Sequence, residues 1–145
     1  MNVELKQNHY DIVEEYKEKV KQLLASLNVA FEDFGTNSID SVDYPDFSHK
    51  ASEAITNGKC ERGIFVCGTG IGMSIVANKH KGIRAAHAES IFTAQMSMEH
   101  NNANVLCLGE RVTGTTNALA MTRAWLNASF SPRHQPRIDK IQALE

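Results

Sequence analysis

Apolar residues recur at intervals of three and four near the N-terminus, beginning at Tyr10. Charged residues such as Glu14, Lys17 and Lys21 fill positions between them. This spacing puts the apolar side chains on one face of an α-helix. The apolar positions are Ile12, Val13, Tyr16, Val20, Leu23, Leu24 and Leu27. We therefore expect a long helix that packs this face on a core.

Shorter helical patterns follow along the chain. One begins after Pro45, with Phe47 on its inward face, and stops at Asn57 and Gly58. Asparagine and glycine favour the left-handed conformation that closes many helices. Another helix is expected to begin near Met73. The remaining helical patterns cover 90–99, 118–126 and 138–144.

Short apolar runs separate these helices. They cover 29–34, 64–67, 82–86 and 104–108. A further candidate strand covers 3–8, although its two charged residues are unusual for a buried strand. Parallel strands need a long crossover connection, which a helix supplies. The alternation therefore predicts an α/β fold in one domain over 1–145. We expect an open five-stranded parallel sheet with helices on both faces and right-handed crossovers.

The composition adds few constraints. The chain has 145 residues, of which 42% are hydrophobic and 22% charged, and its net charge of -2 indicates neither nucleic-acid nor membrane binding. Residues 1–21 carry charges throughout, unlike a signal peptide, so a cytoplasmic location is expected. Cys60, Cys67 and Cys107 lack the paired spacing of a zinc site or a disulfide framework, and we expect no metal.

The clearest chemical motif is the segment 63–78, which reads GIFVCGTGIGMSIVAN. It predicts a strand, a glycine-rich loop and the start of a helix. Glycine at alternate positions permits positive φ and leaves the loop amides open to an anion. Cys67 and Thr69 lie in the same loop, which therefore offers a candidate nucleophile or base beside an anion-stabilising group. Cys60 and Cys107 have no such loop and are interpreted as packing residues.

Other polar residues are expected near this loop. In open parallel sheets, ligands bind beyond the carboxyl ends of the strands. The residues expected to gather there are Asn8, His9, Cys67, Thr69 and His87.

Arg133 and Arg137 flank His134 in a loop before the last helix. If Arg137 opens that helix, both guanidinium groups could point at one phosphate. A solvated basic edge is the alternative interpretation.

The glycine run also allows a nucleotide-binding interpretation, with Glu89 as the acid that contacts a ribose. Its spacing is G-x-G-x-G, however, and differs from the dinucleotide pattern G-x-G-x-x-G. No lysine followed by serine or threonine comes after the loop, which excludes a P-loop.

Five motifs occur in the order SVDYPDF at 41–47, CGTGIGMSIVANK at 67–79, GIRAA at 82–86, HNNANVLCLGERV at 100–112 and RHQPR at 133–137. Together they resemble the ribose-5-phosphate isomerase B family, within the wider group that includes galactose-6-phosphate isomerase, over residues 29–145. The resemblance implies a three-layer Rossmann-like fold and interconversion of an aldose phosphate and a ketose phosphate without metal or cofactor. It also implies a homodimer or a dimer of dimers with shared active sites, and a C-terminal helix, at about 137–144, that packs on a partner subunit.

The resemblance also assigns roles by motif. Cys67 resembles the base that moves a proton between C1 and C2, and His100 would assist ring opening. Some relatives use a glutamate at the position of Met73, which favours the cysteine as base here. The enediolate oxygen would be held by Thr69 and by the amides of Gly68, Gly70, Ile71 and Gly72. The substrate would also contact Asn101, Asp43 and Tyr44. Its phosphate would bind His9, Arg111, Arg133 and Arg137.

The N-terminus departs from the family pattern. Family members normally open with an apolar strand and Gly-x-Asp-His, whereas this chain has VELKQ followed by Asn8, His9 and Tyr10. Asn8 thus stands at a substrate-binding position that is usually aspartate. An amide cannot take a proton from a sugar hydroxyl as a carboxylate can. Either ring opening relies on His100, or the preferred sugar differs from ribose 5-phosphate. Tyr10 would also crowd the entrance of the pocket.

The resemblance therefore implies an isomerase of a phosphosugar, with ribose 5-phosphate and ribulose 5-phosphate as the leading pair, interconverted through an enediolate. A six-carbon substrate of the galactose or allose 6-phosphate type is the alternative within the class. A non-catalytic phosphosugar-binding subunit and a dinucleotide-binding module are the alternatives outside it.

Overall fold

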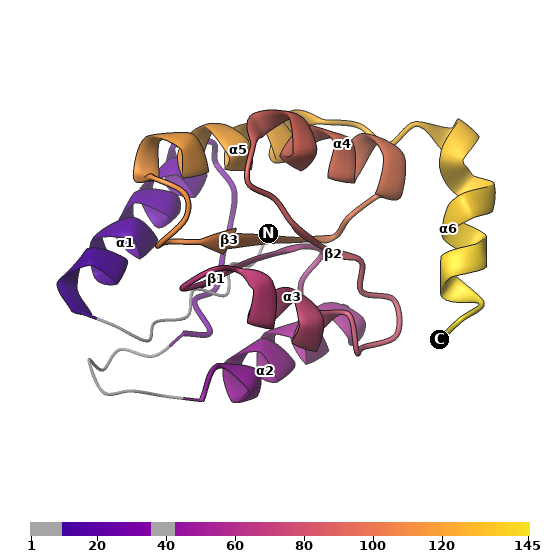
Figure 1. The fold of residues 1–145 in the computed structure, drawn as a ribbon, viewed down its shortest axis with the longest axis horizontal. Coiled ribbons are helices and arrows are strands. Elements are labelled where there is room, and N and C mark those ends of the chain that lie inside the picture. The colour runs from indigo at the N-terminus through magenta and orange to yellow at the C-terminus, as the bar shows by residue number, and fades with distance from the viewer. Residues whose placement is uncertain (1–9, 36–42) are drawn as a thin grey trace.

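The computed structural model describes residues 10–35 and 43–145, and Figure 1 shows the arrangement of their helices and strands. The expected strand at 3–8 and the residues Asn8 and His9 lie outside the described residues. The elements are α1 (Tyr10–Ser26), α2 (Tyr44–Thr56), β1 (Gly63–Cys67), α3 (Ile71–Ala77), β2 (Ala85–His87), α4 (Ile91–Asn101), β3 (Val105–Gly109), α5 (Thr115–Asn127), the 3-10 helix η1 (Pro132–His134) and α6 (Gln135–Gln142).

The described strands form a parallel sheet in the order β1-β3-β2. Gly63 pairs with Val105 and Cys67 pairs with Gly109, so β1 and β3 end at the same edge. The parallel α/β architecture is confirmed. The expected strand at 29–34 has only one bridge residue, Asp33, within the described residues. The five-stranded count therefore stays a prediction.

Alternating side chains of the sheet enter two cores, because successive residues of a strand point to opposite faces. Ile64 and Val66 face a core that α1, α4 and α5 complete. Phe65 and Cys67 face a second core, with Met73 of α3. Figure 1 shows α1, α4 and α5 on one side of the sheet and α2 and α3 on the other. This confirms helices on both faces.

The helix boundaries follow local chemistry. α2 begins at Tyr44, slightly before the expected start, because Pro45 fits the first turn of a helix, where its missing N–H is not needed. Gly58 follows α2 with φ +83°, as expected for a helix stop. Ser90 caps α4 and exchanges hydrogen bonds with Thr93 in a capping box.

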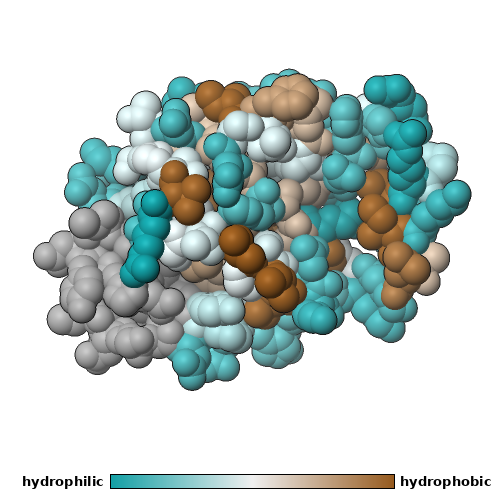
Figure 2. Space-filling model, viewed as in Figure 1, coloured by the Kyte–Doolittle hydropathy of each residue, from teal (hydrophilic) through white to brown (hydrophobic). Residues whose placement is uncertain are grey.

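The C-terminal helix α6 stands apart from the sheet in Figure 1. Its residue Ile138 is buried, whereas Leu144, just beyond its end, is 87% exposed. The Gly82 N–H donates to the Glu145 carboxylate at 2.8 Å. Between α6 and the segment 78–86 lies a cleft of about 690 Å³, with Arg84, Asn101 and Ile141 among its lining. Figure 2 shows apolar side chains exposed on this helix.

None of the described helices is both long enough and apolar enough to cross a bilayer.

Candidate active site

Cys67 is the last residue of β1, a strand that is buried at every position. Its side chain faces the α2–α3 side of the sheet and is 6% exposed. The N–H of Gly70 donates to the Cys67 sulfur at 3.1 Å. This hydrogen bond places a backbone donor directly against the sulfur of Cys67.

We call residues 67–72 the thiol loop, which lies directly on the end of β3. A Cβ atom on Gly109 would lie 2.4 Å from the backbone of Thr69, so only glycine allows this close approach. The chain after β3 then runs beside the loop, where Glu110 N–H donates to the Cys67 carbonyl and Arg111 N–H to the Gly68 carbonyl, both at 3.0 Å. These bonds fix the loop to the centre of the sheet.

Two further side chains border the thiol loop. The Tyr44 ring lies against Gly72, where an added Cβ would be 2.5 Å from the ring carbon Cζ. Asp43, the exposed N-cap residue of α2, precedes it. The side chain of Arg111 approaches Gly68, with its Cδ 3.6 Å from the position of a Cβ there. The structure thus brings Tyr44 and Arg111 to the same edge of the sheet as Cys67.

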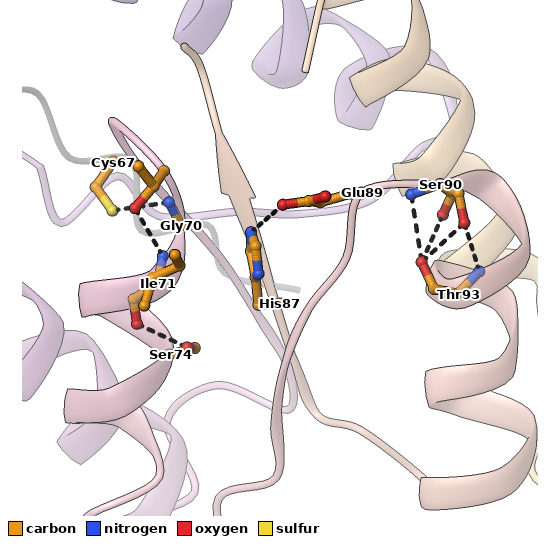
Figure 3. Close-up of polar contacts among 9 residues, drawn as sticks. Cys67, Gly70, Ile71, Ser74, His87, Glu89, Ser90 and Thr93 are labelled. Atoms are coloured by element: carbon orange, nitrogen blue, oxygen red, sulfur yellow. Dashed lines mark hydrogen bonds and ion pairs between the residues drawn. The ribbon is translucent and has the colours of Figure 1, made fainter. Parts of the chain in front are cut away.

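Thr69 is exposed, and its hydroxyl oxygen accepts the Ile71 N–H at 3.2 Å. Figure 3 shows this turn together with the Cys67–Gly70 contact and, beside it, His87 at the end of β2. Cys67, Thr69 and His87 therefore meet at the carboxyl edge of the sheet, as predicted.

A second cluster forms around His134, and we call it the histidine–arginine cluster: His100, Asn101, Arg133, His134 and Arg137. The rings of His100 and His134 pack against each other in a tilted arrangement, with centroids 4.5 Å apart and an interplanar angle of 42°. Arg137 donates to Nδ1 of His134 at 2.9 Å, because a guanidinium has no acceptor. In neutral His134 the proton must then be on Nε2, a buried atom that makes no hydrogen bond within the described residues.

The charge state of His134 follows from its surroundings. Burial, followed by the nearby Arg133, His100 and Arg137, lowers the pKa of His134 below its usual value. Neutral His134 offers a buried N–H, and two arginines stand beside it, which is a suitable environment for a phosphate. In the sequence, His134 stands out only by its position between Arg133 and Arg137, and its contacts become visible in the structure.

The pKa of His134 is lower in the folded chain than in the unfolded chain. As the pH falls, the unfolded chain therefore binds a proton at this histidine before the folded chain does. Folding stability should therefore fall as the pH drops below about 6.5, the ordinary histidine value, toward the folded-state pKa. We expect His134→Gln to show a smaller loss of melting temperature between pH 7 and pH 5 than the parent chain, measured by circular dichroism. An identical pH dependence in the two proteins would contradict this assignment.

The histidine–arginine cluster lies at the opposite edge of the sheet from Cys67. α4 crosses from the end of β2 to the start of β3, so His100 and Asn101 lie near the amino end of β3. Cys67 pairs with Gly109 at the carboxyl end. The five residues of β3 span roughly 13 Å. Ser131 N–H donates to the Glu99 carbonyl at 2.9 Å, which ties η1 and its arginine to the end of α4.

One chain therefore holds two separate groups of predicted site residues. The thiol loop has the candidate base together with Tyr44 and Arg111, and the histidine–arginine cluster has the candidate ring-opening and phosphate-binding residues. Arg111, predicted as a phosphate ligand, lies with the first group. Among the described residues no group of three or more histidine, cysteine or acidic side chains could hold a metal ion.

Comparison with known proteins gives consistent matches. A family model described as Ribose/Galactose Isomerase matches residues 9–141. The chain is 44% identical to the putative sugar phosphate isomerase YwlF of Bacillus subtilis, and the match covers 89% of this chain and 88% of the relative. It is 40% identical to ribose-5-phosphate isomerase B of Escherichia coli, with 89% and 87% covered. It is 43% identical to D-erythrulose-4-phosphate isomerase 2 of Mycolicibacterium smegmatis, with 81% and 80% covered.

Solved structures of ribose-5-phosphate isomerase B are also similar to this chain. Ribose-5-phosphate isomerase B of Clostridium thermocellum superposes with a TM-score of 0.91 at 44% identity, covering 99% of this chain and 97% of that chain. The Mycoplasma genitalium ribose-5-phosphate isomerase B with bound ribulose-5-phosphate has a TM-score of 0.90 at 34% identity, covering 99% and 95%.

Proposed function

Because the chain belongs to the ribose/galactose isomerase family, and is thus an aldose–ketose isomerase of a phosphosugar, we propose that it converts ribose 5-phosphate to ribulose 5-phosphate through an enediolate. The observation that carries the proposal is the Cys67 sulfur, which accepts a backbone N–H at the carboxyl end of a buried strand. A poised base beside preorganised amides is what this proton transfer needs.

The proposed chemistry begins on the open-chain sugar. The Cys67 thiolate takes the proton from C2, and the electrons of that bond form the C1–C2 double bond of the enediolate, leaving negative charge on O1. Loop amides and the Thr69 hydroxyl stabilise this charge. The thiol then returns its proton to C1, while the O2 proton moves to O1 and C2 becomes the ketone. No external oxidant or reductant is needed, because the oxidation of C2 from alcohol to ketone balances the reduction of C1 from aldehyde to alcohol.

Met73 supports cysteine as the base. It occupies the position where some relatives have a glutamate, and here it is fully buried and apolar. Within the thiol loop and the first turn of α3, Cys67 is therefore the side chain best suited to accept a carbon-bound proton.

We further propose that each active site is completed by a second copy of the chain. The thiol loop of one protomer would face His100, Asn101, Arg133, His134 and Arg137 of the other. Two observations support this. The two groups lie at opposite edges of one sheet. Apolar side chains are also exposed on α3, at Ile71 and Ile75, and Figure 2 shows such a patch over this helix.

In this arrangement α6 would pack on the partner. Ile141 and Leu144 are exposed beside the cleft that separates α6 from the rest of the chain. Contact with a second protomer would bury them.

The substrate is tested by turnover of a panel of aldose and ketose phosphates. We expect kcat/KM for ribose 5-phosphate to exceed that for allose 6-phosphate and galactose 6-phosphate by about tenfold or more, because a pocket that fits five carbons must expand to admit six. A four-carbon substrate belongs in the panel, because one relative is named for erythrulose 4-phosphate. A higher kcat/KM for either other class would reassign the substrate.

Asn8 provides a second test of substrate choice. Restoring the family's aspartate with Asn8→Asp should raise kcat for ribose 5-phosphate by about tenfold, because a carboxylate can accept the hydroxyl proton during ring opening. Coupled assays with the cyclic sugar measure this, and Asn2→Asp, which makes the same chemical change at another asparagine near the N-terminus, provides the control. An unchanged kcat would mean that ring opening does not involve position 8.

A further inference from the structure

His87 is the last residue of β2 and lies against the thiol loop. A Cβ atom added to Gly70 would be 2.8 Å from Cδ2 of the His87 ring, so the imidazole contacts Gly70 directly. Figure 3 shows the ring beside the turn formed by Cys67, Gly70 and Ile71. The side chain of His87 is only 22% exposed, so this contact is part of the packed structure.

The end of β3 lies close on the same side of Gly70. The same added Cβ would be 2.9 Å from the Leu108 carbonyl carbon and 3.2 Å from the Gly109 nitrogen. Gly70 has φ +82°, a conformation that glycine adopts without strain. The end of β3 and the ring of His87 thus both pack against the face of Gly70 where a side chain would stand.

The position of Gly70 bears directly on the thiol. Its N–H donates to the Cys67 sulfur at 3.1 Å, and a small rotation of the peptide would lengthen that bond. We propose that His87 is a positioning residue, whose ring keeps the Gly70 N–H aimed at Cys67 and so maintains the reactive thiolate. The inference rests on the proposed function only in taking Cys67 to be the base.

The ring acts through its shape. Nε2 of His87 is buried and makes no hydrogen bond with any described residue. The nearest carboxylate oxygen, on Glu89, is 3.7 Å away, too long for a hydrogen bond, and the Glu89 side chain is 60% exposed. A phenyl ring should therefore replace the imidazole in this contact, whereas alanine should leave Gly70 unsupported.

The test is the rate of Cys67 alkylation by iodoacetamide as a function of pH, with the modified residue identified by peptide mass spectrometry. The reagent reports thiolate and requires no sugar. We expect His87→Ala to slow alkylation at pH 7 about fivefold to tenfold and to move the profile to higher pH, with the limiting rate at high pH retained. His87→Phe should restore the parent profile to within about twofold.

Glu89→Gln is the matched control and should keep the parent profile. A shift as large as that of His87→Ala would overturn the inference, because it would assign the effect to charge. An unshifted His87→Ala profile, or failure of His87→Phe to restore the parent profile, would also overturn it. If His87→Ala does not fold, as judged by circular dichroism, His87→Val removes the ring while keeping a side chain suited to a strand, and the same shift is expected.

Isomerase assays separate this inference from the proposed function. His87→Ala should lower kcat about tenfold with KM within about twofold of the parent value, because the variant affects the base and not the phosphate-binding residues. A shifted alkylation profile in a protein without isomerase activity would support the positioning role and contradict the proposed function. An active isomerase with an unshifted profile would contradict the positioning role alone.

Discussion

We expect Cys67→Ser to lower kcat for the phosphosugar by about a thousandfold, because a serine hydroxyl does not ionise near neutral pH and so cannot serve as the base. The affinity for the sugar phosphate should change little, since the role proposed for the substituted atom is in proton transfer and not in phosphate binding. Steady-state kinetics give kcat, and isothermal titration with the product gives the affinity.

Cys60 provides the matched control. It is also a buried cysteine, but it lies before β1 and away from the thiol loop. Burial, followed by the charge of Glu32, raises the pKa of the Cys60 thiol, which keeps it protonated. Cys60→Ser should therefore retain most of the kcat. Retention of more than about a tenth of kcat in Cys67→Ser would remove Cys67 from its proposed role.

The second large effect is restoration of activity by mixing two inactive variants. If each site is shared between two protomers as proposed, Cys67→Ser and His100→Ala should each be nearly inactive alone, because each variant lacks one half of every site. A mixed dimer carries both substitutions in one site and neither in the other. If protomers assort at random, half of the dimers are mixed, and co-expression should give about a quarter of the parent activity.

Co-expression of Cys67→Ser with Thr69→Ala is the control, because both residues belong to the thiol loop. Every site of that mixed dimer contains one defect, so no restoration is expected. Two affinity tags allow the mixed dimer to be purified and its specific activity measured. Absence of restoration in a confirmed Cys67→Ser/His100→Ala dimer would show that each site is formed within one chain.

Much of the fold follows from local patterns in the sequence. The helical repeat from Tyr10 onward, the apolar run of β1 and the stop at Gly58 each reflect the properties of neighbouring residues. Lys17 shows the limit of this reasoning. The helical pattern puts it among the charged residues between the apolar positions, yet Lys17 is buried and pairs with Asp33 at 2.7 Å. A tertiary ion pair of this kind is invisible to local patterning.

The site was partly predictable for a similar reason. Cys67, Thr69 and the loop glycines are close in sequence, and the loop spacing alone suggests their chemistry. Tyr44 and His87 reach the loop from α2 and β2, and only the packing of those elements shows what they contact. The ring contact between His100 and His134 joins residues 34 positions apart, beyond any local pattern. Their distance from Cys67 follows from the direction in which α4 crosses the sheet.

The placement of His100 at the amino edge of the sheet has a consequence for assays at low enzyme concentration. If two chains complete each site, a dissociated protomer is folded but inactive, and specific activity should decline on dilution once the concentration falls below the dimer dissociation constant. The reaction rate would then rise as the square of the total protein concentration well below that constant. Well above the constant, the rate would rise linearly with protein concentration.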